Sequence, residues 1–402
     1  MAKKTLGEYP PETLTNEIVV VRVDYNVPLD PDGEVVDHTR LVRTLPTVQY
    51  LVEAGARTVL LSHLGRPKAR PEPALSLRPL AGKLEKLLGS PVCFCPATSG
   101  PVAREAVQEM NSGDVLLLEN TRFCPEERRN DLAWAEEIRY GTKLFVNDAF
   151  GAAHRAHAST KGIADAVRVA GGEAVAGFLL EQELRFLRDA IADPEHPFVA
   201  VIGGAKISSK IDVIEALLPA VDRLIIGGAM ANTFFKARGW VVGDSLVEED
   251  RIETAHSLVE LAGDKLRLPV DVVVAPYITS EASTRVAASD EVREGERIGD
   301  IGPRSVQSFA DELDKARTVV WSGPMGVFEL APFQSGTFGV ARAAASTADQ
   351  GATVIVGGGD SVAAVVAAGV VDRITHISTG GSASLELLAG KTLPGVAALS
   401  DR

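Results

Sequence analysis

Short apolar runs recur along this 402-residue chain, and each is followed by a turn and then by a helical pattern. Strands that alternate with helices predict an α/β fold built on doubly wound, Rossmann-like parallel sheets. The runs expected to form strands are residues 18–24, 57–61, 115–119, 143–146, 198–203, 224–226, 270–275, 318–321, 353–356 and 374–377. The chain is too long for a single hydrophobic core, so two such domains are expected.

The expected boundary between the domains is a long helical pattern with a strong apolar face at residues 173–192. Basic residues are frequent in the turns before it and rare in the turns after it. We therefore expect an N-terminal domain over residues 1–172, an interdomain helix or hinge over 173–192, and a C-terminal domain from residue 193.

Composition narrows the possible partners and the compartment. The chain has 41 Lys and Arg against 54 Asp and Glu, a net charge of −13, which argues against nucleic-acid binding. The N-terminus has no apolar core typical of a signal peptide, and the longest apolar run, residues 362–371, is too short to span a bilayer. Three cysteines, Cys93, Cys95 and Cys124, favour a reducing cytoplasm over a disulfide framework, and they lack the ligand pairs of a zinc site.

Basic or amide side chains follow four strands of the first half. They are Arg22 and Asn26, His63 and Arg66, Arg122, and His154 and Arg155. A turn at residues 31–33 and a helix from Arg40 follow the first of these strands. The carboxyl ends of parallel strands share one edge of a sheet, so these groups are expected to converge. Cations that converge in an acidic protein predict a site for a small polyanion such as a phosphorylated acid. The alternative is a set of solvated or structural ion pairs.

The stretch VAVIGGAKISSKI at residues 199–211 predicts a buried strand, a glycine turn at Gly203-Gly204 and a helix. Lys206 and Lys210 are four residues apart and are expected on one face of that helix. Glycines at the start of a helix let backbone N–H groups approach an anion, so the stretch favours a polyphosphate. The alternative is an ordinary strand-to-helix turn with exposed lysines.

Glycine-rich turns at residues 227–230, 322–326, 357–361 and 380–381 indicate that the second half binds a nucleotide through backbone amides. Asp360 directly follows three glycines and is a candidate Mg²⁺ ligand, because Mg²⁺ is often held by one carboxylate plus substrate phosphates. The alternative is that the glycines serve close strand–helix packing. Walker A, dinucleotide-binding and protein-kinase motifs are absent from the sequence.

Nine segments resemble the phosphoglycerate kinase family, in the family's order and over essentially the whole chain. They are RVDYNVP (22–28), SHLGRP (62–67), LLLENTRF (116–123), VNDAFGAAHRAHAS (146–159), GGAKISSK (203–210), GGAMANTF (227–234), GPMGVFE (323–329), GGGDS (357–361) and HISTGG (376–381). The resemblance implies two doubly wound lobes joined by a helix. It also implies that the second lobe runs over residues 193–380 and that residues 381–402 pack back on the first lobe.

The resemblance further implies reversible, Mg²⁺-dependent phosphoryl transfer from 1,3-bisphosphoglycerate to ADP, which gives 3-phosphoglycerate and ATP. The implied acid-binding residues are Asp24, Asn26, Arg40, His63, Arg66, Arg122 and Arg155. The implied nucleotide-binding residues are Lys206, Lys210, Gly228, Glu329, Gly358, Gly359, Asp360 and Ser361, with Asp360 also the metal ligand. Arg40, Lys206, Gly359 and Ser382 are implied to act on the transferring group. The lobes are expected to close during catalysis, and residues 173–192 and 378–382 are the hinge candidates.

Most departures from the family pattern fall in the nucleotide lobe. Ser322 stands where the family usually has Asn, Ser382 replaces a third glycine, and Ile298-Gly299-Asp300 replaces Gly-Leu-Asp. In the acid lobe Ala152 replaces the usual Thr. These changes motivate one alternative, a non-catalytic descendant that binds a phosphorylated acid. Judged without the resemblance, a two-domain dehydrogenase or ligand-binding protein is another alternative. No long exposed apolar stripe is evident, so a monomer is expected.

Overall fold

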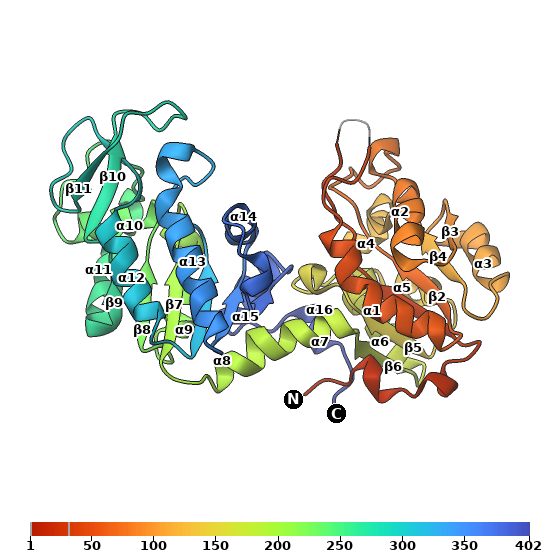
Figure 1. The fold of residues 1–402 in the computed structure, drawn as a ribbon. Coiled ribbons are helices and arrows are strands. Elements are labelled where there is room, and N and C mark those ends of the chain that lie inside the picture. The colour runs from red at the N-terminus through yellow and green to blue at the C-terminus, as the bar shows by residue number, and fades with distance from the viewer. Residues whose placement is uncertain (1, 31–32) are drawn as a thin grey trace. The chain divides into compact units, whose positions relative to one another are not determined.

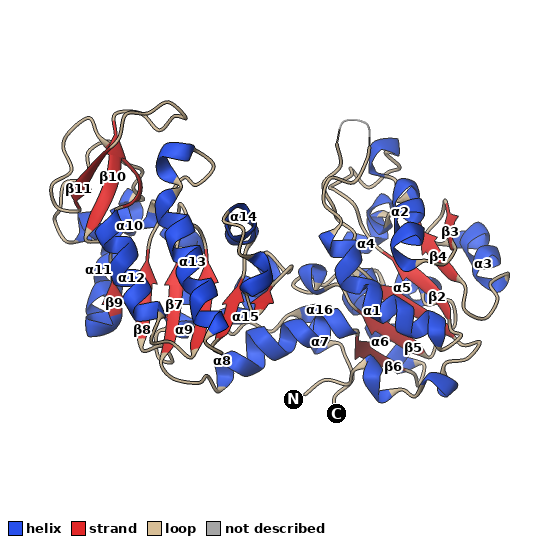
Figure 2. Cartoon of the chain, viewed as in Figure 1, coloured by secondary structure: helices blue, strands red, loops and turns tan. Residues whose placement is uncertain are grey.

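The computed structural model describes residues 2–30 and 33–402, so part of the turn expected at 31–33 lies outside the described residues. The chain divides into two compact units. Unit 1 comprises Met1–Arg185 and Thr392–Arg402, and unit 2 comprises Phe186–Lys391. Each unit contains a parallel six-stranded sheet with helices on both faces (Figures 1 and 2). This architecture confirms the predicted doubly wound α/β class.

The sheet of unit 1 has the strand order β3-β4-β2-β1-β5-β6. Its strands are β1 (Ile18–Arg22), β2 (Arg57–Leu61), β3 (Val92–Cys95), β4 (Val115–Leu118), β5 (Leu144–Asn147) and β6 (Glu173–Ala176). Its helices are α1 (Thr39–Glu53), α2 (Arg78–Leu88), α3 (Gly100–Gln108), α4 (Pro125–Arg129), α5 (Leu132–Ile138), α6 (Ile163–Val169), α7 (Phe178–Leu184) and α16 (Pro394–Ala397). Helices cover both faces of the sheet, so β1 is buried along Val19, Val20 and Val21.

The order of the strands in unit 1 reverses beside β1. The chain builds β2, β4 and β3 on one side of β1 and then places β5 and β6 on the other side. All neighbouring strands are parallel, so β4, β2, β1 and β5 end along one edge, as the sequence predicts. Open α/β sheets bind ligands at such a switch point.

Unit 2 repeats this plan with the strand order β15-β14-β13-β7-β8-β9. Its parallel strands are β7 (Phe198–Ile202), β8 (Arg223–Ile226), β9 (Leu266–Arg267), β13 (Thr318–Ser322), β14 (Thr353–Val356) and β15 (His376–Ile377). Its helices are α8 (Ala190–Ala192), α9 (Ile211–Leu217), α10 (Met230–Ala237), α11 (Ile252–Ala262), α12 (Pro303–Leu313), α13 (Ser335–Asp349), α14 (Gly359–Ala367) and α15 (Ser382–Leu388). The switch point lies between β7 and β13, and Trp321 on β13 is fully buried in the core beside it.

One predicted strand of unit 2 belongs to another sheet. Residues 271–275 form β10 (Asp271–Ala275), which pairs antiparallel with β11 (Arg285–Ala288) and β12 (Arg297–Ile301). An apolar run predicts a strand but not its partners, so the sequence did not separate this small sheet from the main one.

The predicted helix at 173–192 is wrong in its first part. Residues 173–176 form β6, which pairs with β5, and Ala174, Val175 and Ala176 are fully buried. The helical part begins with α7 after Gly177, and a π-helical segment (Arg185–Asp189) and α8 continue it. A short apolar run such as EAVA has no clear period, so a buried strand and a buried helix look alike in sequence.

The C-terminal division also differs from the expected one. Residues 381–391, including α15, lie in unit 2, and only Thr392–Arg402 joins unit 1. Lys391 forms a 2.5 Å ion pair with Asp212 of α9, within unit 2. Asn147 Nδ2 donates to Gly395 O at 3.1 Å, which attaches the start of α16 to the end of β5.

Candidate functional site

Polar groups cluster at the end of β1 in unit 1. Arg40, on α1, forms an ion pair with Asp24, and the Nδ1 atom of His63 lies 3.8 Å from Asp24 Oδ1. Asn26 donates its backbone N–H to Asp24 Oδ1 at 3.3 Å, and its side-chain Oδ1 accepts from Gly65 N at 2.8 Å. Burial opposes ionisation of Asp24, but the charge of Arg40 prevails and lowers the pKa of the carboxyl to about 2. Asp24 is therefore a fixed negative charge among cations.

Three further predicted cations differ in exposure. Arg122 is buried and donates from Nη1 to Gly65 O at 2.7 Å, and its Nε has no hydrogen-bond partner among the described residues. Burial, together with the charges of Arg22 and Arg155, lowers the pKa of Arg122 to about 10. Arg66 and Arg155 are exposed, and Arg155 Nε lies 3.0 Å from His154 Nε2. The charges of Arg22 and Arg155 act on Arg122, and guanidinium groups gathered at one edge of a sheet suit an anion.

A buried group behind this cluster was not among the predicted site residues. Arg22 and Glu127 are fully buried, and Ser159 lies between them. The sequence placed Arg22 among the cations expected to converge at this edge, and the resemblance did not include it among the acid-binding residues; its signal is a charged residue inside an apolar run. Glu127 gave no sequence signal, because it lies in a charged stretch, PEERR, that looks solvent-exposed.

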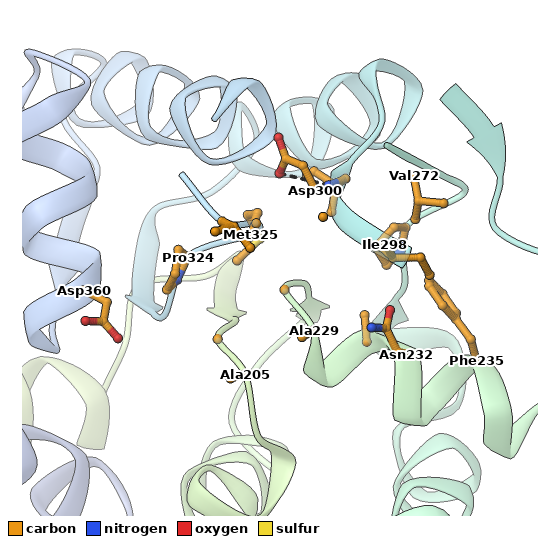
Figure 3. Close-up of a pocket in the computed structure, with 18 of the residues that line it drawn as sticks. Ala205, Ala229, Asn232, Phe235, Val272, Ile298, Asp300, Pro324, Met325 and Asp360 are labelled. Atoms are coloured by element: carbon orange, nitrogen blue, oxygen red, sulfur yellow. Dashed lines mark hydrogen bonds between the residues drawn. The ribbon is translucent and has the colours of Figure 1, made fainter. Parts of the chain in front are cut away.

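Unit 2 contains a cavity of about 260 Å³ at the switch point between β7 and β13. Three predicted nucleotide-binding residues line it, namely Gly228, Glu329 and Asp360. The two ends of the cavity differ in polarity. In Figure 3 the carboxylate of Asp360 lies at one end, and the apolar side chains of Phe235 and Ile298 lie at the other.

The backbone turns that form the cavity approach each other closely. Gly204 N donates to Pro324 O at 2.9 Å, and a Cβ on Gly203 would lie only 2.2 Å from the same carbonyl oxygen. A Cβ on Gly323 would lie 2.1 Å from Gly203 O, and a Cβ on Gly228 would lie 2.6 Å from Gly204 N. At these three positions glycine is required by close packing, the alternative left open by the sequence. The same packing gives the cavity its backbone wall.

The prediction that Lys206 and Lys210 share one helical face is wrong. Lys206 has an extended backbone and precedes a 3₁₀ turn (Ile207–Ser209), and α9 begins only after Lys210. Lys206 is exposed, whereas Lys210 is half-buried and donates from Nζ to Ser322 Oγ at 2.8 Å. Burial lowers the pKa of Lys210 to about 8, and the nearby charge of Asp360 opposes this shift.

The turn into α14 carries four of the predicted residues. Gly358 has a φ of 95°, and Gly359 and Asp360 are exposed in the first turn of the helix. Ser361 is buried, and its Oγ accepts from Gly323 N at 2.6 Å, which ties this turn to the one after β13. Among the described residues, Asp360 belongs to no group of three or more histidine, cysteine, aspartate or glutamate side chains that could hold a metal ion.

The structure accommodates two other departures from the family pattern, Ser382 and Ile298. Ser382 is exposed in the first turn of α15 and is not among the described residues with positive φ, so serine is unstrained there. Ile298 lines the cavity next to Asp300. Asp300 accepts from Gly336 N at 2.6 Å, and burial raises its pKa to about 7.

Comparison with known proteins resolves the family. A family model described as phosphoglycerate kinase matches residues 12–391. The chain belongs to the phosphoglycerate kinase family. It is 53% identical over 406 residues to the phosphoglycerate kinase of Chloroflexus aurantiacus, with both chains fully covered. It is 54% identical to that of Rubrobacter xylanophilus, with 97% of each chain covered.

Solved structures agree with this assignment. The phosphoglycerate kinase of Coxiella burnetii matches with a TM-score of 0.87 at 39% identity, and that of Pyrococcus horikoshii with 0.83 at 33%, each with 98% of both chains covered. The expected fold and the phosphotransferase activity with a carboxyl acceptor are thereby confirmed. Nothing in the comparisons supports the non-catalytic alternative. Among the described residues, no helix combines the length and apolarity needed to cross a membrane.

Proposed function

We propose that unit 1 binds 3-phosphoglycerate or 1,3-bisphosphoglycerate at the edge formed by β1, β2, β4 and β5. The residues assigned to this site are Asp24, Asn26, Arg40, His63, Arg66, Arg122 and Arg155. The observation that carries the proposal is a set of cations around one ionised aspartate in a protein of net charge −13. Arginine forks suit the carboxylate and phosphate groups of such a substrate.

Unit 2 binds ADP or ATP in the cavity between β7 and β13. The apolar end near Phe235 and Ile298 suits the nucleobase, and the end near Asp360 suits the phosphates. Lys206 and Lys210 supply positive charge to the phosphates, and Glu329 accepts hydrogen bonds from ribose hydroxyls. The backbone N–H groups of Gly359 and Ser382, each at a helix start, donate to anionic oxygens. Gly228, Gly358 and Ser361 shape the backbone around them.

Asp360 fits Mg²⁺ that is shared with the nucleotide. It is a single exposed carboxylate at a helix start, and Mg²⁺ commonly combines one or two carboxylates with substrate phosphates and water. When bound, Mg²⁺ neutralises phosphate charge. A chelating cluster is not needed for this arrangement, which agrees with the lack of one among the described residues.

The chemistry requires positioning and charge rather than a general base. In the direction that makes ATP, the attacking β-phosphate oxygen of ADP is already ionised. The residues must align donor and acceptor and place positive charge around the transferring oxygens. Arg40 and Lys206 serve this purpose. We also propose that the protein works as a monomer in the cytoplasm, and its three free cysteines fit a reducing compartment.

The direct test is turnover of 3-phosphoglycerate with MgATP, followed by ADP release. The unaltered protein should be active, and Arg40→Ala and Lys206→Ala should each lower kcat by about 10²–10³-fold, because each removes charge from the transition state. Arg43→Ala, three residues along α1, and Lys236→Ala, whose lysine pairs with Glu249, are matched controls that should keep activity. Retained binding of 3-phosphoglycerate without turnover in the unaltered protein would contradict the proposal.

A further inference from the structure

A buried chain of hydrogen bonds lies behind the basic residues of unit 1. Ser159 donates its hydroxyl to Glu127 Oε1 at 2.7 Å and its backbone N–H to Oε2 at 2.8 Å. Arg22 donates from Nε to Ser159 Oγ at 2.8 Å, and its Nη2 lies 2.9 Å from His63 Nδ1. All four residues are buried, and they come from α4, the π-helical segment (Ala158–Gly162), β1 and the turn after β2.

The donors and acceptors available fix the direction of each hydrogen bond between Glu127 and His63. A guanidinium only donates, so the bond between Arg22 and His63 requires Nδ1 of His63 to be the acceptor. A neutral imidazole whose Nδ1 accepts must carry its proton on Nε2. At the other end, the Ser159 hydroxyl accepts from Arg22 and donates its single proton to Glu127. Arg22 therefore keeps a proton off Nδ1 of His63, and Glu127, through Ser159, fixes the position of Arg22.

We propose that Glu127, Ser159 and Arg22 are positioning residues that hold His63 as the neutral Nε2–H tautomer. The part of this inference that concerns substrate rests on the proposed function. His63 then presents one directed N–H donor, and not a cation, to the phosphorylated acid. The arginines supply the positive charge that attracts the substrate, and the imidazole N–H orients it by a directed hydrogen bond.

The charged groups around His63 support the neutral form. Burial, together with the charges of Arg22, Arg122 and Arg40, holds the pKa of His63 well below its ordinary value, and Asp24 acts in the opposite direction. A proton on Nδ1 would point at a guanidinium N–H, so protonation requires the bond to Arg22 to break. Asp24 is already engaged by Arg40, and its 3.8 Å separation from His63 Nδ1 exceeds a hydrogen bond.

The first test measures the tautomer in the unaltered full-length protein. Nitrogen-15 NMR of its seven histidine rings, with His63 assigned by its loss in His63→Gln, reports which ring nitrogen carries the proton. We expect a protonated Nε2 and an unprotonated Nδ1 that do not change between pH 5.5 and pH 8. A protonated Nδ1, or titration near the ordinary histidine pKa of about 6.5, would overturn the proposal. This result does not depend on whether the protein turns over 3-phosphoglycerate.

The second test breaks the series of hydrogen bonds between Glu127 and His63 at Ser159. Ser159→Ala removes the acceptor of Arg22 Nε but keeps the backbone bond to Glu127. We expect His63 to titrate in this variant and KM for 3-phosphoglycerate to rise about tenfold, which corresponds to one lost hydrogen bond, while KM for MgATP stays the same. Ser99→Ala is the control. The Ser99 hydroxyl, at the start of α3, accepts from Trp134 Nε1 at 3.1 Å and takes no part in the hydrogen bonds that connect Glu127 to His63.

The pH profile separates positioning from simple destabilisation. The substrate phosphate itself titrates near pH 6, so both variants share that dependence. Only Ser159→Ala should add a change in KM for 3-phosphoglycerate that follows His63. Identical KM values and pH profiles in the two variants would overturn the role of Ser159. An inactive unaltered protein whose His63 has the expected tautomer would refute the proposed function alone.

Discussion

Lys206 and Lys210 differ in burial, and burial lowers the pKa of Lys210 to about 8. Lys206 is exposed and lies before the helical turn, whereas Lys210 is half-buried against Ser322 and near Asp360. Ser322 replaces the asparagine usual in the family, and its hydroxyl accepts from Lys210 Nζ at 2.8 Å. The substitution is therefore compatible with a lysine side chain held in a fixed position, and Lys210 should respond to pH near 8.

We predict that affinity for MgADP falls as pH rises through about 8, the pKa to which burial lowers Lys210. Lys210 is charged below this pH and attracts phosphate oxygens, and that charge is lost above it. Calorimetric titrations at pH 7 and pH 9 should show a weaker complex at pH 9. Lys210→Met should be weak at both values, and Lys206→Met should keep the difference. The opposite pattern would assign the pH dependence to Lys206.

The cavity also depends on the absence of a side chain at Gly323. Gly323→Ala should destabilise unit 2 and abolish MgADP binding, because the added Cβ would lie 2.1 Å from Gly203 O. Gly351→Ala is a matched control, since both glycines have similar φ, 98° and 94°, but nothing lies within 4 Å of a Cβ at Gly351. The control should cost only the conformational strain of about 1–2 kcal/mol. Thermal unfolding with and without MgADP measures both effects, and equal losses would contradict the prediction.

Among the secondary-structure elements, the sequence predicted the strands that are buried on both faces of a sheet. Strands such as β1 and β7 are long apolar runs in parallel sheets, so their position and the basic or glycine-rich turns after them could be predicted. The sequence missed β3, whose Cys93 is exposed, and the two-residue β9, because neither has a strong apolar signal. The prediction that Lys206 and Lys210 share one helical face was wrong for another reason. Four-residue spacing implies a shared face only in an unbroken helix, and the turn at 207–209 interrupts it.

The start of α7 depends on a buried carboxyl. Asp148 is fully buried, and its Oδ1 accepts from Leu179 N at 2.9 Å and from Leu180 N at 3.1 Å. Its Oδ2 has no hydrogen-bond partner among the described residues. Burial raises the pKa of Asp148 to about 7, although the hydrogen bonds from Thr47, Leu180 and Leu179 lower it.

We predict that Asp148 makes the protein less stable as pH rises from 4 to 7. Its folded-state pKa of about 7 lies above the ordinary value of 3.8, so its contribution is present below pH 4 and is lost through pH 7. Asp148→Asn keeps an acceptor for Leu179 and Leu180 but cannot ionise. The Tm of Asp148→Asn minus the Tm of the unaltered protein should be several degrees larger at pH 8 than at pH 5. Asp131→Asn, at the partly exposed N-cap of α5, is the control.

At the scale of the whole molecule, the same architecture is used twice for different chemistry. Both units place a site where the strand order of a parallel sheet reverses, beside β1 in unit 1 and between β7 and β13 in unit 2. Unit 1 fills that edge with cations, and unit 2 fills it with glycine turns. The chain passes between the units after Arg185 and again after Lys391. Each substrate should therefore act first on its own unit.

We predict that hydrogen exchange separates the two binding events. 3-Phosphoglycerate alone should slow exchange in the turns after β1, β2, β4 and β5, and MgADP alone should slow it in the turns after β7, β13 and β14, because ligands stabilise the segments they order. Asp24→Asn should remove the effect of the acid and keep that of MgADP, since Asp24 lies only in the unit 1 cluster. Protection by the acid that appears first in unit 2 would contradict this division of the substrates.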